Sequence, residues 1–388
     1  MKNNGIFFSR ATARGSIGWA LGIAFTTFYV VLYWFPANLE GGIRLMDPLS
    51  YALAGKAANQ WFLYGFLYTI SMIIFGFRMI MKYRHNRYQL IRTVSVVFFQ
   101  LGFAFLIPNI LMLLSQPEFY FSYFWPLKPD YLFPDTVRYF VDHPGGLGLF
   151  MISWGAVMIF VATPVLTYFL GKRWYCSWVC GCGGLAETVG DPYRQLSDKS
   201  SGSWKVERWL IHSVLVFVVV TTSALWINEA TSGSIFGSFS HEARKTYGFL
   251  IGAFFSGVAG VGFYPLLGSR VWCRFGCPMA AILGFFQRYW SRFRITTNGS
   301  QCMSCGNCST YCEMGIDVRA YAQRGENIVR SSCVGCGVCS AVCPRGVLKL
   351  ENGSTHKDRF PGADKPVSAF LESLGLKTRT KGKGPYMT

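Results

Sequence analysis

Eight of the thirteen cysteines lie between positions 302 and 343, in a polar segment near the end of a mostly apolar chain. They form the spacing C-x2-C-x2-C-x3-C twice, and Pro344 follows the second copy. A cubane [4Fe-4S] cluster needs four thiolates, and close spacing lets one tight loop wrap three irons while the fourth ligand comes from elsewhere. The segment therefore predicts two [4Fe-4S] clusters with redox as their chemistry.

The same spacing is that of two-cluster bacterial ferredoxins, in which the fourth cysteine of each copy binds the cluster of the other copy. One cluster is expected on Cys302, Cys305, Cys308 and Cys343, and the other on Cys333, Cys336, Cys339 and Cys312. Glycines at 306, 335 and 337 permit the positive φ angles that such loops need. A pair of zinc knuckles would also use C-x2-C pairs, but zinc gives no reason for the repeated triple with a distant fourth cysteine. Glu313 stands where the first copy often carries proline, which affects loop rigidity rather than ligation.

Four more cysteines form an internal repeat. The segments GKRWYCSWVCGCGG (171–184) and GSRVWCRFGCPMAA (268–281) align, which pairs Cys176 with Cys273 and Cys180 with Cys277. If each segment continues the apolar helix before it, its two thiols share one helix face. The four sulfurs would then hold a third cluster or a metal ion, or form a thiol relay; the alternative is that they are small residues that pack helices together. Cys182 is left over and could substitute as a ligand.

The composition predicts an α-helical, polytopic membrane protein. Hydrophobic residues make up 51% of the chain and charged residues only 14%, with a mean hydropathy of +0.29. Because a membrane-spanning helix takes about 20 apolar residues, six stretches qualify. They are 16–36, 61–82, 91–115, 147–170, 208–228 and 247–267. The first lacks a small-residue cleavage motif and is expected to remain as a helix.

The charge pattern predicts the orientation. The net charge of +18 comes mostly from Lys and Arg beside the apolar stretches rather than from one basic face, so we expect positive-inside topology and no nucleic-acid partner. Six crossings would place both termini in the cytoplasm of a bacterium, beneath its inner membrane. The expected domains are a membrane domain (1–295), a cytoplasmic two-cluster, ferredoxin-like α+β domain (296–350) and a loosely ordered basic tail (351–388).

These features together resemble the membrane polyferredoxin family. The resemblance covers about 130–348, and its best motifs are CRFGCP, CEMGIDV and the two cluster-binding runs, whereas CSWVCG has Gly181 where the family has proline. Members include the quinol-dehydrogenase membrane subunit of periplasmic nitrate reductase systems, the nitrous-oxide reductase regulatory flavoprotein and a cytochrome oxidase accessory protein. The resemblance implies respiratory electron exchange between the membrane quinone pool and the clusters. It also implies partners among cytochrome, iron-sulfur or reductase subunits.

No motif locates a quinone site. A quinone is an apolar ring with two carbonyls, so hydrogen-bond donors near Cys176 and Cys273 would suit it. The candidates are His212, Arg173, Arg270, Gln100 and Asn109. Haem is not expected, because axial ligation of haem b takes paired membrane histidines and only His212 lies within a span. No G-x-G-x-x-G motif indicates nucleotide binding.

Two other functions fit the same residues. The protein could be an assembly factor that reduces copper for a respiratory oxidase, with the CxxxC pairs as metal-handling thiols. It could instead be a cluster-bearing membrane anchor of a larger redox complex, without a quinone site of its own. Copper binding by the membrane region would favour the first, and stable copurification with redox subunits together with indifference to quinone would favour the second.

Overall fold

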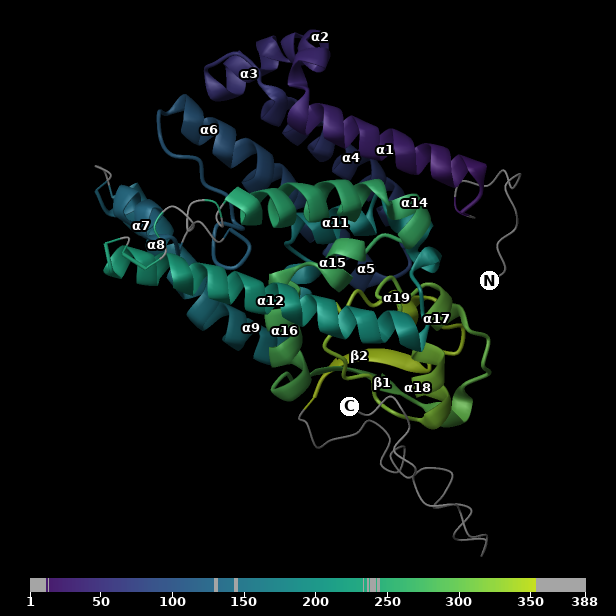
Figure 1. The fold of residues 1–388 in the computed structure, drawn as a ribbon. Helices are drawn as coiled ribbons and strands as arrows, with labels where there is room; N and C mark the ends of the chain where they lie inside the picture. The colour runs from purple at the N-terminus through teal and green to yellow at the C-terminus, as the bar shows by residue number, and fades with distance from the viewer. Residues whose placement is uncertain are drawn as a thin grey trace, which may run out of the picture.

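A computed structural model describes residues 12, 14–128, 132–142, 146–232, 234, 235, 237, 242 and 245–353. A bundle of long helices forms the larger part of the molecule, and a small lobe with two strands packs against one end of it (Figure 1). The expected basic tail lies outside the described residues from position 354 onward.

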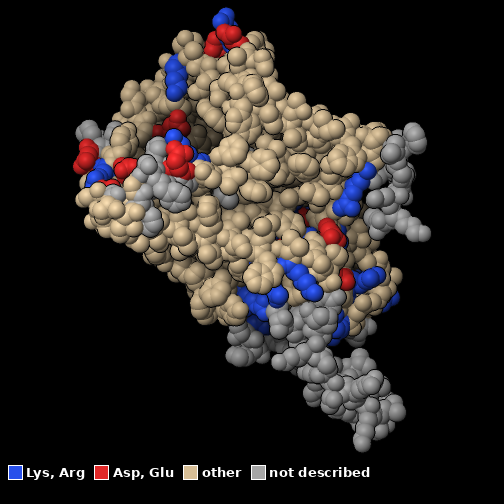
Figure 2. Space-filling model, in the orientation of Figure 1, with Lys and Arg blue, Asp and Glu red and all other residues tan. Residues whose placement is uncertain are grey.

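Five helical segments in the described ranges are long and apolar enough to cross a membrane. They are α1 (Ser16–Trp34), α4 (Gln60–Lys82), Arg87–Leu113, Leu147–Leu170 and α12 (Ser201–Ala230). The third consists of α5 (Arg87–Leu101), η2 (Gly102–Leu106) and α6 (Ile107–Leu113), and the fourth of α8 (Leu147–Val157), η4 (Met158–Ala162) and α9 (Thr163–Leu170). At most 28% of their most apolar stretches is buried inside the chain. Figure 2 shows the result as a broad band almost free of charged residues, and exposed apolar surface of this extent favours a lipid environment.

The sixth expected span, 247–267, is not one unbroken α-helix. It consists of η6 (Gly248–Gly262), which has π-helical hydrogen bonding, and α14 (Tyr264–Leu267), with a turn at Phe263 between them. Six crossings therefore remain a prediction. The start of α1 does lie at the same end of the bundle as the small lobe. Arg14 donates hydrogen bonds to the carbonyls of Leu196 and Leu266, and the neighbouring Ser197 hydroxyl donates to the carbonyl of Glu313 in the lobe (2.7 Å).

The far end of the bundle carries shorter helices. They are η1 (Pro36–Leu39), α2 (Glu40–Arg44), α3 (Asp47–Ala54) and α7 (Pro134–Val141). Asn59 caps the start of α4 there by accepting a hydrogen bond from the Phe62 amide (2.9 Å). In Figure 1, α2 and α3 lie well away from the two strands.

Two short helical hairpins carry the internal repeat. The first contains α10 (Arg173–Cys176) and α11 (Gly181–Glu187), followed by η5 (Asp191–Leu196), and the second contains α15 (Val271–Phe275) and α16 (Pro278–Tyr289). The condition under which the thiols of a CxxxC pair would share one helix face, that the segment continues the preceding helix, is met in neither copy. Gly171 (φ +69°) and Gly268 (φ +95°) end the preceding helices, a conformation that favours glycine. Cys180 and Cys277 then adopt extended backbone as the N-caps of α11 and α16.

The small lobe is built on an antiparallel strand pair. β1 (Phe293–Thr297) pairs with β2 (Leu348–Asn352), with Ile295 opposite Leu350. The turns between them contain η7 (Gly299–Gln301), α17 (Asn307–Thr310), α18 (Val318–Arg324) and α19 (Val338–Ala341). β1 starts just after α16, three residues before the expected domain boundary. One core joins lobe and bundle, because Phe293 and Ile295 belong to the same buried cluster as Trp174, Tyr175 and Met279.

Candidate functional site

The eight cysteines of the small lobe surround two separate small cavities. Cys302, Cys305, Cys308 and Cys343 line the first, and Cys312, Cys333, Cys336 and Cys339 line the second. The fourth cysteine of each copy thus lies with the first three of the other, as the crossed ligand sets require. We call these two sets the outer and the inner thiol groups. The binding of clusters to them remains a prediction, which this grouping fits.

The loops that carry these thiols have the backbone that cluster binding needs. Gly306, Gly335 and Gly337 have φ angles of +82°, +63° and +74°, as expected from their positions. The amide of Ile316 donates to the sulfur of Cys312 at 3.4 Å, and amide hydrogen bonds to sulfur tune the potential of a bound cluster.

The inner group faces the bundle and the outer group faces away from it. The carbonyl of Cys336 accepts hydrogen bonds from Gln89 (2.8 Å) and Arg92 (2.7 Å) on α5, and the carbonyl of Cys333 accepts one from Gln287 (2.6 Å) on α16. In the outer group, by contrast, Cys305 is exposed. The inner group is therefore the one fixed to the membrane-facing part of the chain.

The four CxxxC cysteines come together beneath the lobe. Cys176, Cys273 and Cys277 are buried, Cys180 is partly buried, and all four belong to, or pack against, one buried cluster. The Arg270 guanidinium lies 3.7 Å from the Cys273 sulfur and donates to the Cys176 carbonyl (3.1 Å). We call these four the membrane-face thiols. Among the described residues, no three His, Cys, Asp or Glu side chains are grouped so as to hold a single metal ion.

Cys182 is the cysteine that the repeat did not assign. A hydrogen bond with Cys182 lowers the pKa of the Cys180 thiol to about 7, whereas burial raises the pKa of Cys176 to about 12. Cys182 is exposed, and it lines two neighbouring cavities of the bundle. The sequence signal for it was the CGC spacing, in which Cys182 directly follows the second thiol of the first pair.

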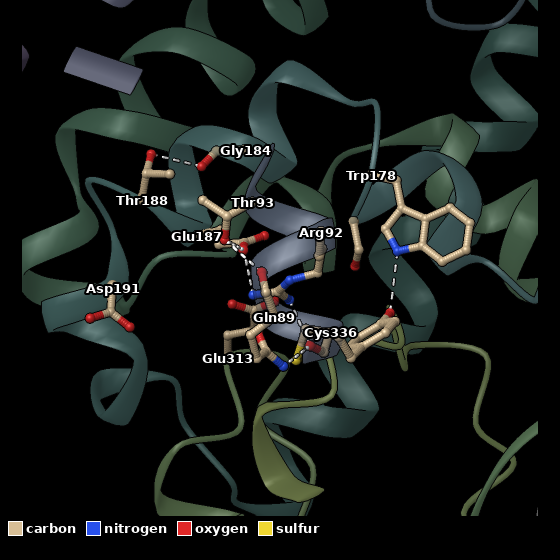
Figure 3. Close-up of polar contacts among 12 residues, drawn as sticks. Gln89, Arg92, Thr93, Trp178, Gly184, Glu187, Thr188, Asp191, Glu313 and Cys336 are labelled. Carbon is tan, nitrogen blue, oxygen red and sulfur yellow. Dashed lines mark hydrogen bonds and ion pairs between the residues drawn. The ribbon is translucent and has the colours of Figure 1, made fainter. Parts of the chain in front are cut away.

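A buried ionic network joins the membrane-face thiols to the inner group. Figure 3 shows part of it, with Arg92, Glu187 and Glu313 beside Cys336. Glu313 pairs with Arg194 (2.5 Å) and Arg270 (2.9 Å), and all three side chains are fully buried. Burial alone would raise the pKa of Glu313, but the two guanidinium groups lower it to about 2. Arg92 pairs in the same way with Glu187 (2.5 Å). Glu313 directly follows the inner-group ligand Cys312, so its role is to fix that loop to both hairpins, which sequence reasoning missed.

The structure separates the quinone candidates. Arg173 stacks on Phe293 (4.5 Å) and donates to Asn352 (3.0 Å), and Arg270 belongs to the ionic network. His212 lines a different, smaller pocket on α12. Gln100 and Asn109, in contrast, both line one large cavity.

That cavity has a volume of about 580 Å³ and ends at two cysteines. Its walls include Tyr29, Tyr33, Tyr64, Tyr68, Gln100, Asn109 and Tyr264, and Cys182 and Cys273 lie at its inner end. The Tyr68 hydroxyl donates to the Gln100 carbonyl oxygen (3.0 Å), and the Gln100 amide donates to the carbonyl of Val179 (2.6 Å). A second cavity of about 410 Å³ shares Gln100, Tyr120, Ser122 and Cys182 with the first. We treat them as two arms of one tyrosine-lined cavity.

Comparison with known proteins identifies the chemistry of these cysteines. A family described as a 4Fe-4S binding domain matches residues 153–200 and 249–298, which contain the two CxxxC pairs. A 4Fe-4S dicluster domain matches residues 294–344. The chain is therefore similar to polyferredoxin-like proteins. The expected resemblance to polyferredoxins is thereby confirmed, and the matched domains support iron-sulfur clusters in this chain.

Two curated proteins are similar to part of this chain. YccM of Escherichia coli K12, whose assignment to electron transport is provisional, is 28% identical over 182 residues, or 42% of this chain and 47% of YccM. MauN of Paracoccus denitrificans, a methylamine utilization ferredoxin-type protein, is 28% identical over 175 residues, or 42% of this chain and 56% of MauN. The matches thus span about half the length of each relative. No solved structure matches the chain.

Proposed function

We propose that this protein exchanges electrons between membrane quinone and a redox partner. The observation that supports it best is the tyrosine-lined cavity, which is large enough for a ring and ends at Cys182 and Cys273. From Cys273 the contact continues through Arg270 and Glu313 to the inner thiol group. When bound, each cluster at the two thiol groups takes up or gives one electron. A quinone in the cavity would thus lie beside the start of a short route into the lobe.

The cavity offers what a quinone needs. Aromatic walls suit the apolar ring, while the second amide hydrogen of Gln100, which is not used in its bond to Val179, offers a donor for a carbonyl oxygen. Tyr68 and Gln100 both line the larger arm, as do Gly181 and Cys182. Gln100 is also held in place by its bond to Val179, which keeps its amide oriented toward the thiol hairpin.

A bacterial cytoplasmic membrane, with the lobe in the cytoplasm, is the proposed location. Three basic residues lie in or directly beside the turn between α4 and α5, namely Lys82, Arg84 and Arg87. This turn lies at the lobe end of the bundle, since Lys82 pairs with Asp191 there (2.6 Å). Basic loops stay on the cytoplasmic side. Protease added to intact spheroplasts should leave the lobe uncut, and cleavage of the lobe under those conditions would reverse this orientation.

The partner is proposed to dock where the outer thiol group reaches the surface. Met303 is 58% exposed there, and the exposed residues Arg319 and Arg345 line the same small cavity as Cys305. A basic rim around an exposed cluster edge suits an acidic electron carrier. Electron transfer to an acidic flavodoxin should therefore slow severalfold as salt rises from about 0.01 to 0.5 M, in stopped-flow traces. A rate indifferent to salt would contradict a charged docking edge.

Replacing Gln100 with leucine should slow oxidation of the reduced protein by quinone about tenfold, since one lost hydrogen bond of about 1–1.5 kcal/mol has that effect. The protein would be placed in liposomes, reduced with dithionite and mixed with menaquinone, and cluster absorbance followed by stopped flow. His212→Ala is the matched control, because His212 lies in the separate pocket. Slowing in His212→Ala with none in Gln100→Leu would move the quinone site to α12.

A further inference from the structure

The tyrosine-lined cavity runs along the bundle rather than across it. Gln89 and Arg92, near the start of α5, contact the Cys336 loop of the lobe. The segment Arg87–Leu113 has 27 residues, so at about 1.5 Å per residue it ends about 40 Å from the lobe. Glu118 follows that far end and lines the cavity, as does Lys56 from the turn before α4. The cavity therefore reaches the face of the bundle opposite the lobe, and its other end lies at Cys182 and Cys273.

The far end of the cavity is open and charged. Glu118 and Lys56 are exposed, and the Glu118 carboxylate makes a hydrogen bond with Tyr120, which lines both arms. Ser122, two residues after Tyr120, is also exposed and lines both arms of the cavity. Figure 2 shows a hollow on this side of the molecule with acidic and basic side chains around it.

The lobe end is closed. Cys273 and Ser269 line the cavity there and are buried, and behind them Arg270 and Glu313 are ion-paired with fully buried side chains. Polar groups that could pass a proton therefore continue from Tyr68 and Gln100 toward Ser122, Tyr120 and Glu118, whereas the opposite direction ends at fully buried ion pairs.

We infer that protons and electrons leave the quinone site at opposite faces of the membrane, with Glu118 at the proton exit. This inference rests on the proposed function. On quinol oxidation the two O–H bonds break and the two carbonyls of the quinone form. Two electrons leave at the cysteine end and two protons leave past Glu118 to water on the face opposite the lobe. The reaction therefore separates charge across the membrane, and quinone reduction would do so in the reverse direction.

Thiol labelling tests the opening of the cavity without turnover. Full-length, cluster-loaded protein in liposomes of known orientation would be exposed to a membrane-impermeant methanethiosulfonate from either side, and Cys182 modification read by peptide mass, with Cys182→Ser as the blank. We expect labelling of Cys182 only from the face opposite the lobe, and slower labelling with quinone present. Labelling only from the lobe side, or from neither side, would overturn the inference.

Proton release tests the charge separation. With the lobe facing outward, menaquinol in the bilayer and ferricyanide outside, the lumen should acidify by one proton per electron and become positive, as reported by a trapped pH dye and a potential-sensitive dye. Protons appearing outside with no potential would overturn the inference alone. No quinol-dependent ferricyanide reduction above protein-free liposomes would overturn the proposed function as well.

A carboxylate variant tests the exit. Glu118→Gln should slow lumen acidification about threefold or more, because a positioned carboxylate speeds proton transfer, while reduction of the clusters by dithionite stays unchanged. Glu40→Gln is the matched control, since Glu40 is an exposed carboxylate of the far-end helix α2, paired with Arg44. Equal rates in the two variants would remove Glu118 from the exit.

Discussion

Replacing Glu313 with alanine should destabilise the lobe by about 3–5 kcal/mol, because it leaves two guanidinium groups buried without their shared counter-ion. Arg194 and Arg270 are both fully buried and both pair with this carboxylate. Neither guanidinium side chain has solvent-exposed surface. The loss should be measured as a lower midpoint of thermal or denaturant unfolding, followed by the visible absorbance of the clusters in detergent.

The matched control for this prediction is Glu326→Ala. Glu326 also pairs with an arginine, Arg324 at 2.9 Å, but both side chains are about 40% exposed (45% and 39%), and such surface pairs contribute about 0–1 kcal/mol. Should Glu313→Ala not assemble at all, Glu313→Gln keeps a hydrogen-bonding group and should fall between the two. Equal midpoints for Glu313→Ala and Glu326→Ala would show that the ionic network does not hold the lobe to the hairpins.

Replacing Cys343 with alanine should remove the same cluster as replacing Cys302, although the two residues belong to different copies of the motif. Both line the outer cavity, whereas Cys312 lines the inner one with Cys333. Each variant should lose about four iron atoms per chain. In electron paramagnetic resonance of the reduced protein, Cys343→Ala and Cys302→Ala should share one spectrum, and Cys312→Ala and Cys333→Ala another.

Comparing the spectra of these four cysteine variants with one another also tests the alternative to the crossed arrangement. If each copy of the motif held its own cluster, Cys343→Ala would instead match Cys333→Ala, and Cys312→Ala would match Cys302→Ala. That pattern would contradict the grouping of thiols around the two cavities. Cys182→Ala should retain both spectra, since Cys182 lines neither the outer nor the inner thiol cavity of the lobe.

The spacing of the cysteines predicted the arrangement of the lobe better than the apolar stretches predicted the course of the chain around the CxxxC pairs. The two thiol groups of the lobe were predicted because the spacing of Cys302 to Cys343 is that of two-cluster ferredoxins, in which the fourth cysteine of each copy joins the set of the other. The course of the CxxxC segments could not be predicted, because whether a helix continues past Gly171 depends on Phe293, whose ring would lie 2.7 Å from a Cβ at that position. Such a contact between distant segments has no local signal in the sequence.

The partners of the polar residues could not be predicted either, because they too depend on contacts between segments that are distant in the sequence. Arg270 follows an apolar stretch, as an arginine at a membrane surface would, and its sequence context does not reveal its partner Glu313, 43 residues away. Gln100 and Asn109 were candidates only because they interrupt an apolar stretch. Their common cavity depends on α4, α5 and the first thiol hairpin packing together, and the glutamate at its far end, Glu118, follows a helix end that no motif marks.

The most direct test of the central claim, that quinone binds in the tyrosine-lined cavity, is photoaffinity labelling with an azido-quinone. The cluster-loaded protein in liposomes would be illuminated with the probe, digested and mapped by mass spectrometry, with excess menaquinone as competitor. The structure predicts competitor-sensitive labelling of segments that line the cavity, from α4, from Gln100 to Asn109 and near Cys182. Competitor-sensitive labelling confined to α12 around His212, or labelling that menaquinone does not reduce, would contradict it.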